Sequence, residues 1–299
     1  MSKPIHIVLT FDDRYWAPAY ALMRSVCLFT FRRKDVRFHL FHRPLTERHW
    51  WWLNEITREF GAELISYDID ANTVFTSIAE RAHYNARLSN IVYARVLFDE
   101  LLPADVERVL YLDCDMMVRA PIERLYDIDM QGFPLAAVPD YVGAQIMTRR
   151  SLIDPRGIFD PAMRYFNAGM LLIDMAKWRQ MHILDKFEEA IANGTLARIY
   201  YDQDFLNLTF RENWLELHQF WNLHDPKPAH MALNPHLIHY TGDTKPWHIM
   251  PKVAFRRLYR HIMTNPVYYE YLRERSPAWQ RPFIAFVERR NKITGTPDN

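Results

Sequence analysis

Short apolar runs alternate with longer segments of helical periodicity through residues 5–67. The apolar runs have the length and the β-branched and aromatic content of strands. Pro18 suits a first helical turn, Thr46 an N-cap and Gly61 a helix end. Strands alternating with helices predict βαβ units in a mainly parallel sheet. The expected strands are residues 5–10, 36–42 and 63–67, and the expected helices are residues 16–29 and 47–60.

The same alternation continues to about residue 250. Residues 71–85 are expected to form a loop with a short helix, and residues 90–102 a helix that stops before Pro103. Further strands are predicted at 108–115, 135–140, 168–174 and 237–240, with helices at 175–193 and from Tyr201 onward. Beyond Pro251 the chain becomes basic, aromatic and helical. We therefore expect one α/β domain over residues 1–250 and a helical C-terminal extension over 251–299.

Composition and charge narrow the class of protein. The 299 residues are 49% hydrophobic, enough for a sizeable core. Lys and Arg number 37 against 36 Asp and Glu, so nucleic acid is not an expected partner. No signal peptide or membrane-spanning run is visible, and the only cysteines are Cys27 and Cys114. These features favour a reduced, cytoplasmic protein.

Two aspartates follow the most apolar of the later strands. Asp113 and Asp115 end the run that begins at Arg108. Because side chains alternate along an extended chain, both carboxylates can project to one face and share a hard cation. Asp-x-Asp alone is a weak signal, since surface loops often contain it. Its position matters more, because ligands of open parallel sheets gather at the carboxyl ends of the strands.

Glycine-rich phosphate loops are missing from the sequence. Only 8 residues are glycine, and neither G-x-G-x-x-G nor a Walker loop occurs. A bound nucleotide would therefore need another partner for its phosphates. A divalent metal together with a lysine can do this.

Separated stretches, taken in order, resemble glycosyltransferase family 8, a family of retaining enzymes that includes bacterial lipopolysaccharide galactosyl- and glucosyltransferases. The most specific stretch is the last, in which His239 precedes Gly242 and Lys245. The family implies a Rossmann-like, GT-A type nucleotide-binding sheet, a UDP-sugar donor and a catalytic Mn²⁺. The matching stretches are IVLTFDDRY at 7–15, YAR at 93–95, VLYLDCD at 109–115, YFNAG at 165–169, YDQD at 201–204 and HYTGDTKPW at 239–247.

The resemblance also implies roles for individual residues. Asp113, Asp115 and His239 would bind Mn²⁺, and Mg²⁺ could substitute for it. Two carboxylates and one imidazole suit Mn²⁺ better than Ca²⁺. Lys245 would bind the diphosphate, and Gly242 belongs to the same stretch. The other implied donor-binding residues are Thr10, Asp12 and Tyr15 around uracil and ribose, Arg95 near the diphosphate and sugar, and Asn167, Asp202 and Gln203 along the sugar.

Some of these positions have ordinary alternatives. Arg14 stands at a position where members of the family often have a small polar residue. Arg95 could instead be an exposed helix arginine paired with Asp99 at i+4. Asp140 matches a position on the acceptor side, although strand ends often carry aspartates.

The expected reaction moves galactose or glucose from UDP to an oligosaccharide or lipid-linked glycan, such as a lipopolysaccharide core. Lys245 and the metal would neutralise the charge growing on the diphosphate. The resemblance implies that the position beneath the anomeric carbon is occupied by Gln203, an amide and a poor nucleophile, beside Asp202. Same-face substitution is therefore the favoured hypothesis. A glycosyl adduct trapped on Asp202 or Asp204 would contradict it.

The C-terminal stretch at 277–292 mixes aromatic and basic residues. This composition fits an interfacial helix on the inner face of an anionic membrane, where a lipid-linked acceptor would be found. It fits equally a helix packed on the catalytic domain. Two other functions stay open: a catalytically silent UDP-sugar-binding protein, and a metal-dependent nucleotidyltransferase or phosphohydrolase.

Overall fold

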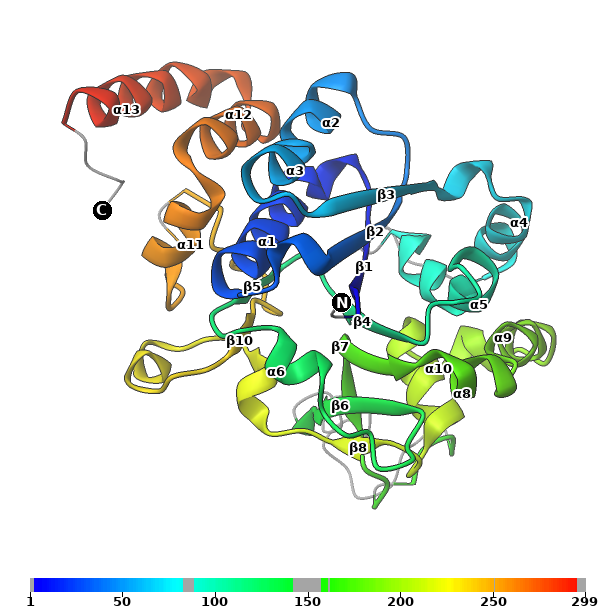
Figure 1. The fold of residues 1–299 in the computed structure, drawn as a ribbon. Helices are drawn as coiled ribbons and strands as arrows, with labels where there is room; N and C mark the ends of the chain where they lie inside the picture. The colour runs from blue at the N-terminus through cyan, green and yellow to red at the C-terminus, as the bar shows by residue number, and fades with distance from the viewer. Residues whose placement is uncertain (1–2, 83–88, 142–156, 161, 250, 295–299) are drawn as a thin grey trace.

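The computed structural model describes residues 3–82, 89–141, 157–160, 162–249 and 251–294. A seven-stranded sheet with the order β3-β2-β1-β4-β7-β6-β8 runs through its centre (Figure 1). β1, β2, β3 and β4 are parallel, whereas β7 is antiparallel to both of its neighbours. The predicted α/β class with a mainly parallel sheet is confirmed. The strands are β1 (Ile5–Phe11), β2 (Val36–His42), β3 (Glu63–Asp68), β4 (Arg108–Leu112), β6 (Leu135–Pro139), β7 (Phe166–Asp174) and β8 (Leu215–Glu216).

A second, small sheet joins β5 (Met116–Val118), β10 (Leu237–His239) and β9 (Leu223–His224) in the order β5-β10-β9. β5 begins directly after Asp115, and β10 ends at His239. The antiparallel pairing of β10 with β5 places His239 opposite Met116. This pairing brings together two stretches that lie more than a hundred residues apart in the sequence.

Helices cover both faces of the large sheet, and the alternation along β1 explains why. Ile5, Ile7 and Leu9 belong to the core cluster that contains α1, whereas Val8 belongs to the cluster on the opposite face. The helices of the first half are α1 (Trp16–Phe29), α2 (Glu47–Leu53), α3 (Glu55–Phe60), α4 (Thr73–Arg81), α5 (Phe98–Leu101) and α6 (Glu123–Tyr126). Those of the second half are α8 (Met175–Gln180), α9 (Ile183–Ala192), α10 (Tyr201–Phe210), α11 (Arg256–Met263), α12 (Asn265–Arg275) and α13 (Arg281–Thr294).

Three expected helices are more broken than the periodicity suggested. The segment before Gly61 divides at Asn54, and the segment after Met175 divides at His182, which has a left-handed backbone with φ 49°. Residues 90–97 form a 3-10 helix, η4 (Asn90–Leu97), before the short α5. Most side chains of η4 are buried. It therefore lacks the single apolar face, opposite an exposed polar face, of an ordinary surface helix.

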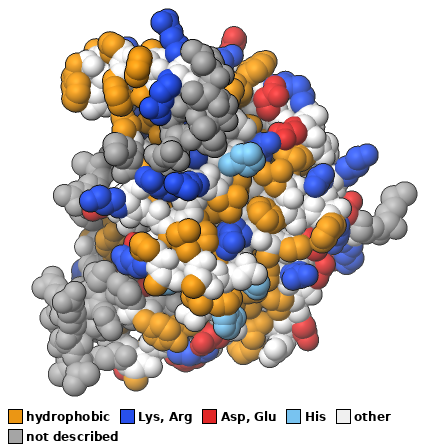
Figure 2. All heavy atoms as spheres, turned by 90° about the vertical axis from the view of Figure 1, so that its left-hand side faces the viewer, with side chains coloured by type: hydrophobic (Ala, Val, Ile, Leu, Met, Phe, Trp, Pro, Cys, Tyr) orange, Lys and Arg blue, Asp and Glu red, His pale blue; other side chains and the backbone are white. Residues whose placement is uncertain are grey.

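The C-terminal helices lie side by side at the upper left of Figure 1. α11 and α12 contribute Tyr259, Ile262 and Tyr269 to the same core cluster as α1. α13 is more exposed, and Phe283 and Phe286 are largely open to solvent. Hydrophobic and basic side chains interleave over this side of the molecule (Figure 2). No helix within the described ranges has both the length and the apolar content needed to span a membrane.

Candidate active site

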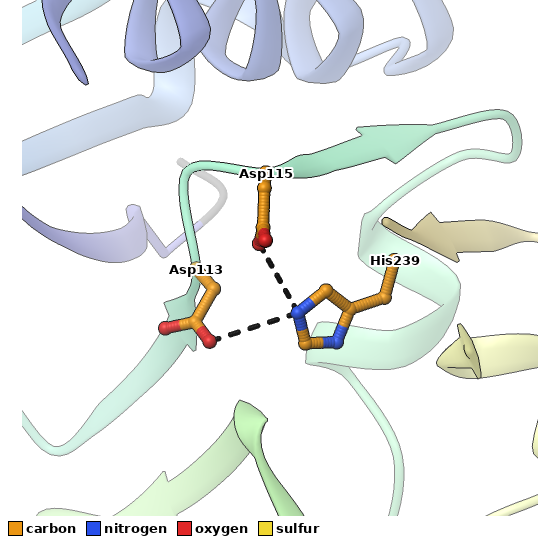
Figure 3. Close-up of side chains that lie close together, drawn as sticks. All are labelled: Asp113, Asp115 and His239. Carbon is orange, nitrogen blue, oxygen red and sulfur yellow. Dashed lines mark ion pairs between the residues drawn. The ribbon is translucent and has the colours of Figure 1, made fainter. Parts of the chain in front are cut away.

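Asp113, Asp115 and His239 converge where the two sheets meet (Figure 3). His239 Nε2 lies 3.1 Å from Asp115 Oδ1 and 3.7 Å from Asp113 Oδ2. One ligand atom from each residue lies within 4.8 Å of the other two. The expectation that both aspartates share a face of one extended strand was wrong. A turn at Cys114 and Asp115 carries the chain from β4 to β5, in the other sheet, and this turn brings the carboxylates together.

Each carboxylate uses one oxygen within the protein and turns the other toward His239. Asp113 Oδ1 accepts a hydrogen bond from the Tyr111 hydroxyl at 2.6 Å. Asp115 Oδ2 lies 2.7 Å from Lys245 Nζ, and the interactions of Asp115 with His239 and Lys245 outweigh burial and hold the pKa of Asp115 well below its usual value. Both carboxylates are therefore oriented before any ligand binds.

Gly169 provides the space beside the cluster. A Cβ at this position would lie 2.3 Å from His239 Cε1 and 2.7 Å from Asp113 Oδ2, distances that real Cβ atoms do not adopt. Two carboxylates and one imidazole, held around a space that only glycine leaves open, form a donor set that suits Mn²⁺ or a similar cation. The residues present fit a bound metal, and Asp113, Asp115 and His239 would hold it.

Asn222 orients the histidine and was missed by the sequence analysis. Its side chain is 1% exposed, and its Oδ1 lies 3.0 Å from His239 Nδ1. With the proton on Nδ1 donated to Asn222, the Nε2 lone pair faces the aspartates. Asn222 Nδ2 in turn donates to Asn167 Oδ1 at 3.0 Å. The sequence around Asn222 carries no motif, and only the pairing of β9 with β10 brings it to the site.

Replacing Asn222 by alanine should weaken Mn²⁺ binding by about 10- to 100-fold, the usual cost of losing a hydrogen-bond partner behind a metal-binding histidine. Isothermal titration of the purified variant with Mn²⁺ measures this. Asn54→Ala, which removes an exposed amide far from the cluster, is the control and should bind Mn²⁺ like the wild type. Equal affinities for the wild type and Asn222→Ala would show that Asn222 does not orient His239.

Arg95 is buried between two carboxylates. Its side chain is 3% exposed, with Nε 2.7 Å from Asp202 Oδ2 and Nη2 3.5 Å from Asp113 Oδ1. Its guanidinium also donates to the Ala168 carbonyl at 2.7 Å. The alternative of an exposed helix arginine paired with Asp99 is wrong. The tight turns of η4 direct Arg95 into the protein, where it links Asp202 to the metal cluster.

Asp202 and Gln203 lie in the first turn of α10, which begins on a strained backbone. Tyr201, just before them, has φ 52°, a conformation that side chains other than glycine rarely adopt and that recurs at functional sites. Burial raises the pKa of Asp202 to about 6, against the opposing effect of Arg95. Gln203 Oε1 accepts from the Ala168 amide at 3.0 Å.

Two of the residues predicted along the donor sugar, Asn167 and Gln203, belong to one hydrogen-bonded group. Asn167 Nδ2 donates to Asp140 Oδ2 at 3.1 Å, and Gln203 Nε2 approaches the same oxygen at 3.4 Å. Tyr165 lies 3.1 Å from Gln203 Nε2 and donates to Asp204 at 2.6 Å. Asp140, assigned to the acceptor side from the sequence, thus contacts the residues assigned to the sugar. This group continues from Asn167 through Asn222 to His239, whereas Asp202 pairs with Arg95 instead.

A hollow of about 230 Å³ opens beside the cluster at the carboxyl ends of β1 and β4. Its lining includes Thr10, Asp12, Tyr15, Asp113 and Asp115. Thr10 Oγ1 lies 3.0 Å from the Tyr111 hydroxyl, which links this hollow to Asp113. The residues predicted around the nucleoside, Thr10, Asp12 and Tyr15, therefore share one pocket with the two aspartates of the cluster.

Two positions near this pocket were less clear from the sequence. Arg14 forms an ion pair with Asp12, 2.7 Å from Nη2 to Oδ2, so it orients that carboxylate. Gly242 follows β10 in the loop that carries Lys245, and a Cβ there would meet Asp225 at an ordinary 3.5 Å. A hydrogen bond of 2.5 Å from Lys245 Nζ to the Tyr240 carbonyl fixes the position of the lysine within this loop.

The sheet order and the cluster of two aspartates and one histidine beside a lysine are those expected from the sequence resemblance, and comparison with known proteins agrees on the family. Residues 6–250 match the model of glycosyl transferase family 8. The chain belongs to this family.

Similar proteins cover most of the chain at modest identity. General stress protein A of Bacillus subtilis is 26% identical over 278 residues, covering 87% of this chain and 93% of that protein. The lipopolysaccharide 1,2-glucosyltransferase of Escherichia coli is 28% identical over 185 residues, 57% of this chain and 54% of that protein. Against glycosyltransferase GlyD of Streptococcus pneumoniae, by contrast, the matched region is only 30% of the longer protein.

Solved structures agree on the fold. The galactosyltransferase LgtC, crystallised with donor and acceptor sugar analogues, superposes with a TM-score of 0.71 at 24% identity, covering 93% of this chain and 99% of LgtC. The apo form of GlyE from Streptococcus pneumoniae has a TM-score of 0.63 at 18% identity, and the match covers 91% of this chain and 64% of the GlyE chain. The chain therefore has the GT-A type fold expected from its motifs.

Proposed function

We propose that the protein is a retaining glycosyltransferase that moves galactose or glucose from a UDP-sugar to a glycan acceptor, with Mn²⁺ at Asp113, Asp115 and His239. The observation that carries the proposal is the cluster itself, with Lys245 directly beside it. Membership of glycosyl transferase family 8 supports the reaction class. The similarity to a lipopolysaccharide glucosyltransferase supports a bacterial surface glycan, such as a lipopolysaccharide core, as acceptor.

The leaving diphosphate needs positive charge as the sugar bond breaks. A bound divalent cation supplies part of this charge as a Lewis acid. Lys245, 2.7 Å from Asp115, would supply another part, since its ammonium lies at the edge of the same cluster. The buried Arg95 would keep Asp202 and Asp113 in place and add to the positive potential.

Same-face substitution is the favoured route, because neither nearby carboxylate resembles an available nucleophile. Asp202 pairs with Arg95, and Asp204 is fully buried and accepts hydrogen bonds from Tyr165 and the Tyr200 amide. Gln203, the remaining candidate, is an amide. The leaving phosphate oxygen would then help to take the proton of the acceptor hydroxyl.

Slow donor hydrolysis tests the proposal without a known acceptor. Incubation with UDP-galactose or UDP-glucose and Mn²⁺, followed by proton NMR, should first reveal the α-anomer of the released sugar, since retention preserves the donor configuration. If the β-anomer of the sugar appeared first instead, a retaining mechanism would be excluded. Release of inorganic phosphate or cleavage of UTP would favour a phosphohydrolase or nucleotidyltransferase, and UDP binding without hydrolysis or transfer would favour a silent binding protein.

The acceptor would be lipid-linked, and we propose that α13 contacts the inner face of the membrane from the cytoplasm. Phe283 and Phe286 are 59% and 64% exposed, and they line a hollow of about 350 Å³ together with Arg257 and Arg290. Exposed aromatic rings beside arginines suit an anionic lipid surface (Figure 2).

Replacing both Phe283 and Phe286 by serine should sharply reduce flotation with vesicles of phosphatidylglycerol and phosphatidylethanolamine. The matched control is Phe31→Ser, because Phe31 is 87% exposed but lies away from α13. Undiminished flotation of the double variant would mean that α13 does not carry membrane binding.

A further inference from the structure

One wall of the nucleotide pocket comes from outside the region that matches the family. The pocket lined by Asp12, Tyr15, Asp113 and Asp115 is also lined by Arg275, the last residue of α12. The family match ends at residue 250. The C-terminal helices therefore contribute directly to the pocket that lies beside the metal cluster.

Specific contacts fix the last turn of α12 against the loop after β1. The Tyr271 hydroxyl donates to the Arg14 carbonyl at 2.9 Å, and Tyr271 is only 4% exposed. Glu274 accepts from Trp16 Nε1 at 3.0 Å and lies 3.0 Å from His49 Nε2. Tyr271 and Glu274 thus hold the last turn of α12, which ends at Arg275, against the neighbouring segments. This anchoring gives Arg275 a defined position at the pocket.

The charges around the pocket distinguish Arg275 from the other cations. Arg14 is paired with Asp12, and Lys245 with Asp115, each at 2.7 Å. Among the described residues, the Arg275 guanidinium forms no ion pair and no hydrogen bond, and its charge acts on the nearby Tyr271 hydroxyl. A guanidinium presents several donors in a planar fork that matches phosphate oxygens. Arg275 can therefore meet an anionic ligand without first breaking a contact to a described side chain.

We infer that Arg275 binds a phosphate oxygen of the donor nucleotide, so that α12 completes the diphosphate-binding wall of the pocket. The inference rests on the proposed use of a UDP-sugar. It adds a positive charge to the pocket that Asp113 and Asp115 also line, and it makes the C-terminal helices part of the donor site.

Calorimetric titration with UDP and with uridine, both in the presence of Mn²⁺, tests the inference. Arg275→Gln should weaken UDP binding by about tenfold, the usual scale of one charge-assisted hydrogen bond, and leave uridine binding unchanged. Arg273→Gln is the matched control. It removes the same charge two residues away, where the arginine pairs with Glu288 of α13, and it should bind UDP like the wild type.

The outcomes separate this inference from the proposed function. A wild type that does not bind UDP contradicts the proposed function itself. A wild type that binds UDP, with Arg275→Gln binding equally well, overturns the role of Arg275 alone. Equal losses for UDP and uridine overturn the assignment to phosphate. A thermal unfolding curve unchanged by Arg275→Gln is expected, because the side chain is exposed and has no described partner.

Discussion

Replacing Asp115 by asparagine should lower the rate of UDP-sugar cleavage by about 10³-fold or more. The variant loses a carboxylate 3.1 Å from His239 Nε2, and Lys245 loses its charged partner at the same time. Removing the metal's share of charge stabilisation costs several kcal/mol, and each ~1.4 kcal/mol of barrier is tenfold in rate. UDP release, followed with a coupled assay at saturating Mn²⁺, measures the effect.

Asp185→Asn is the control for this experiment, because Asp185 is 80% exposed on α9 and lies outside the site. It should retain the wild-type rate. An Asp115→Asn enzyme with more than about a tenth of the wild-type rate would contradict a role for Asp115 in binding the metal.

Replacing Gly169 by alanine should abolish Mn²⁺ binding while the protein stays folded. The added methyl group would lie 2.3 Å from His239 Cε1 and 2.7 Å from Asp113 Oδ2, so at least one ligand must move out of the cluster. Titration of the variant with Mn²⁺, with circular dichroism to verify the fold, measures the result.

Gly194→Ala provides the comparison. Gly194 has φ 74°, so alanine there strains the backbone, but no atom lies within 4 Å of the added Cβ. This variant should lose some stability and still bind Mn²⁺ normally. If Gly169→Ala also bound Mn²⁺ normally, the cluster could not be the metal site as we describe it.

The sequence predicted the sheet well because its strands are short, apolar and separated by recognisable helix signals. The predicted strand 36–42 and helix 16–29 match β2 and α1 residue for residue. Gly61 ends α3 in the left-handed conformation that suggested a helix end. β5, β8 and β9 were missed, because two or three residues carry no measurable periodicity.

Within the site, the sequence indicated the residues whose chemistry is unusual and missed those that act through position. The three residues expected to bind a metal do lie together, but the turn between β4 and β5 depends on the pairing of β5 with β10, which no local pattern encodes. Arg95 could equally have been a surface arginine, since its burial depends on how η4 packs. Asn222 and Arg275 belong to no motif, and only the tertiary structure brings Asn222 to His239 and Arg275 to the pocket.

The most direct test of the account is UDP release from UDP-galactose and from UDP-glucose, each measured with and without Mn²⁺ for the wild type and Asp115→Asn. We predict release by the wild type that requires Mn²⁺ and prefers one of the two sugars, and almost none by the variant. Release that continues at the same rate in EDTA, or equally in both proteins, would contradict a metal-dependent transferase built on Asp113, Asp115 and His239.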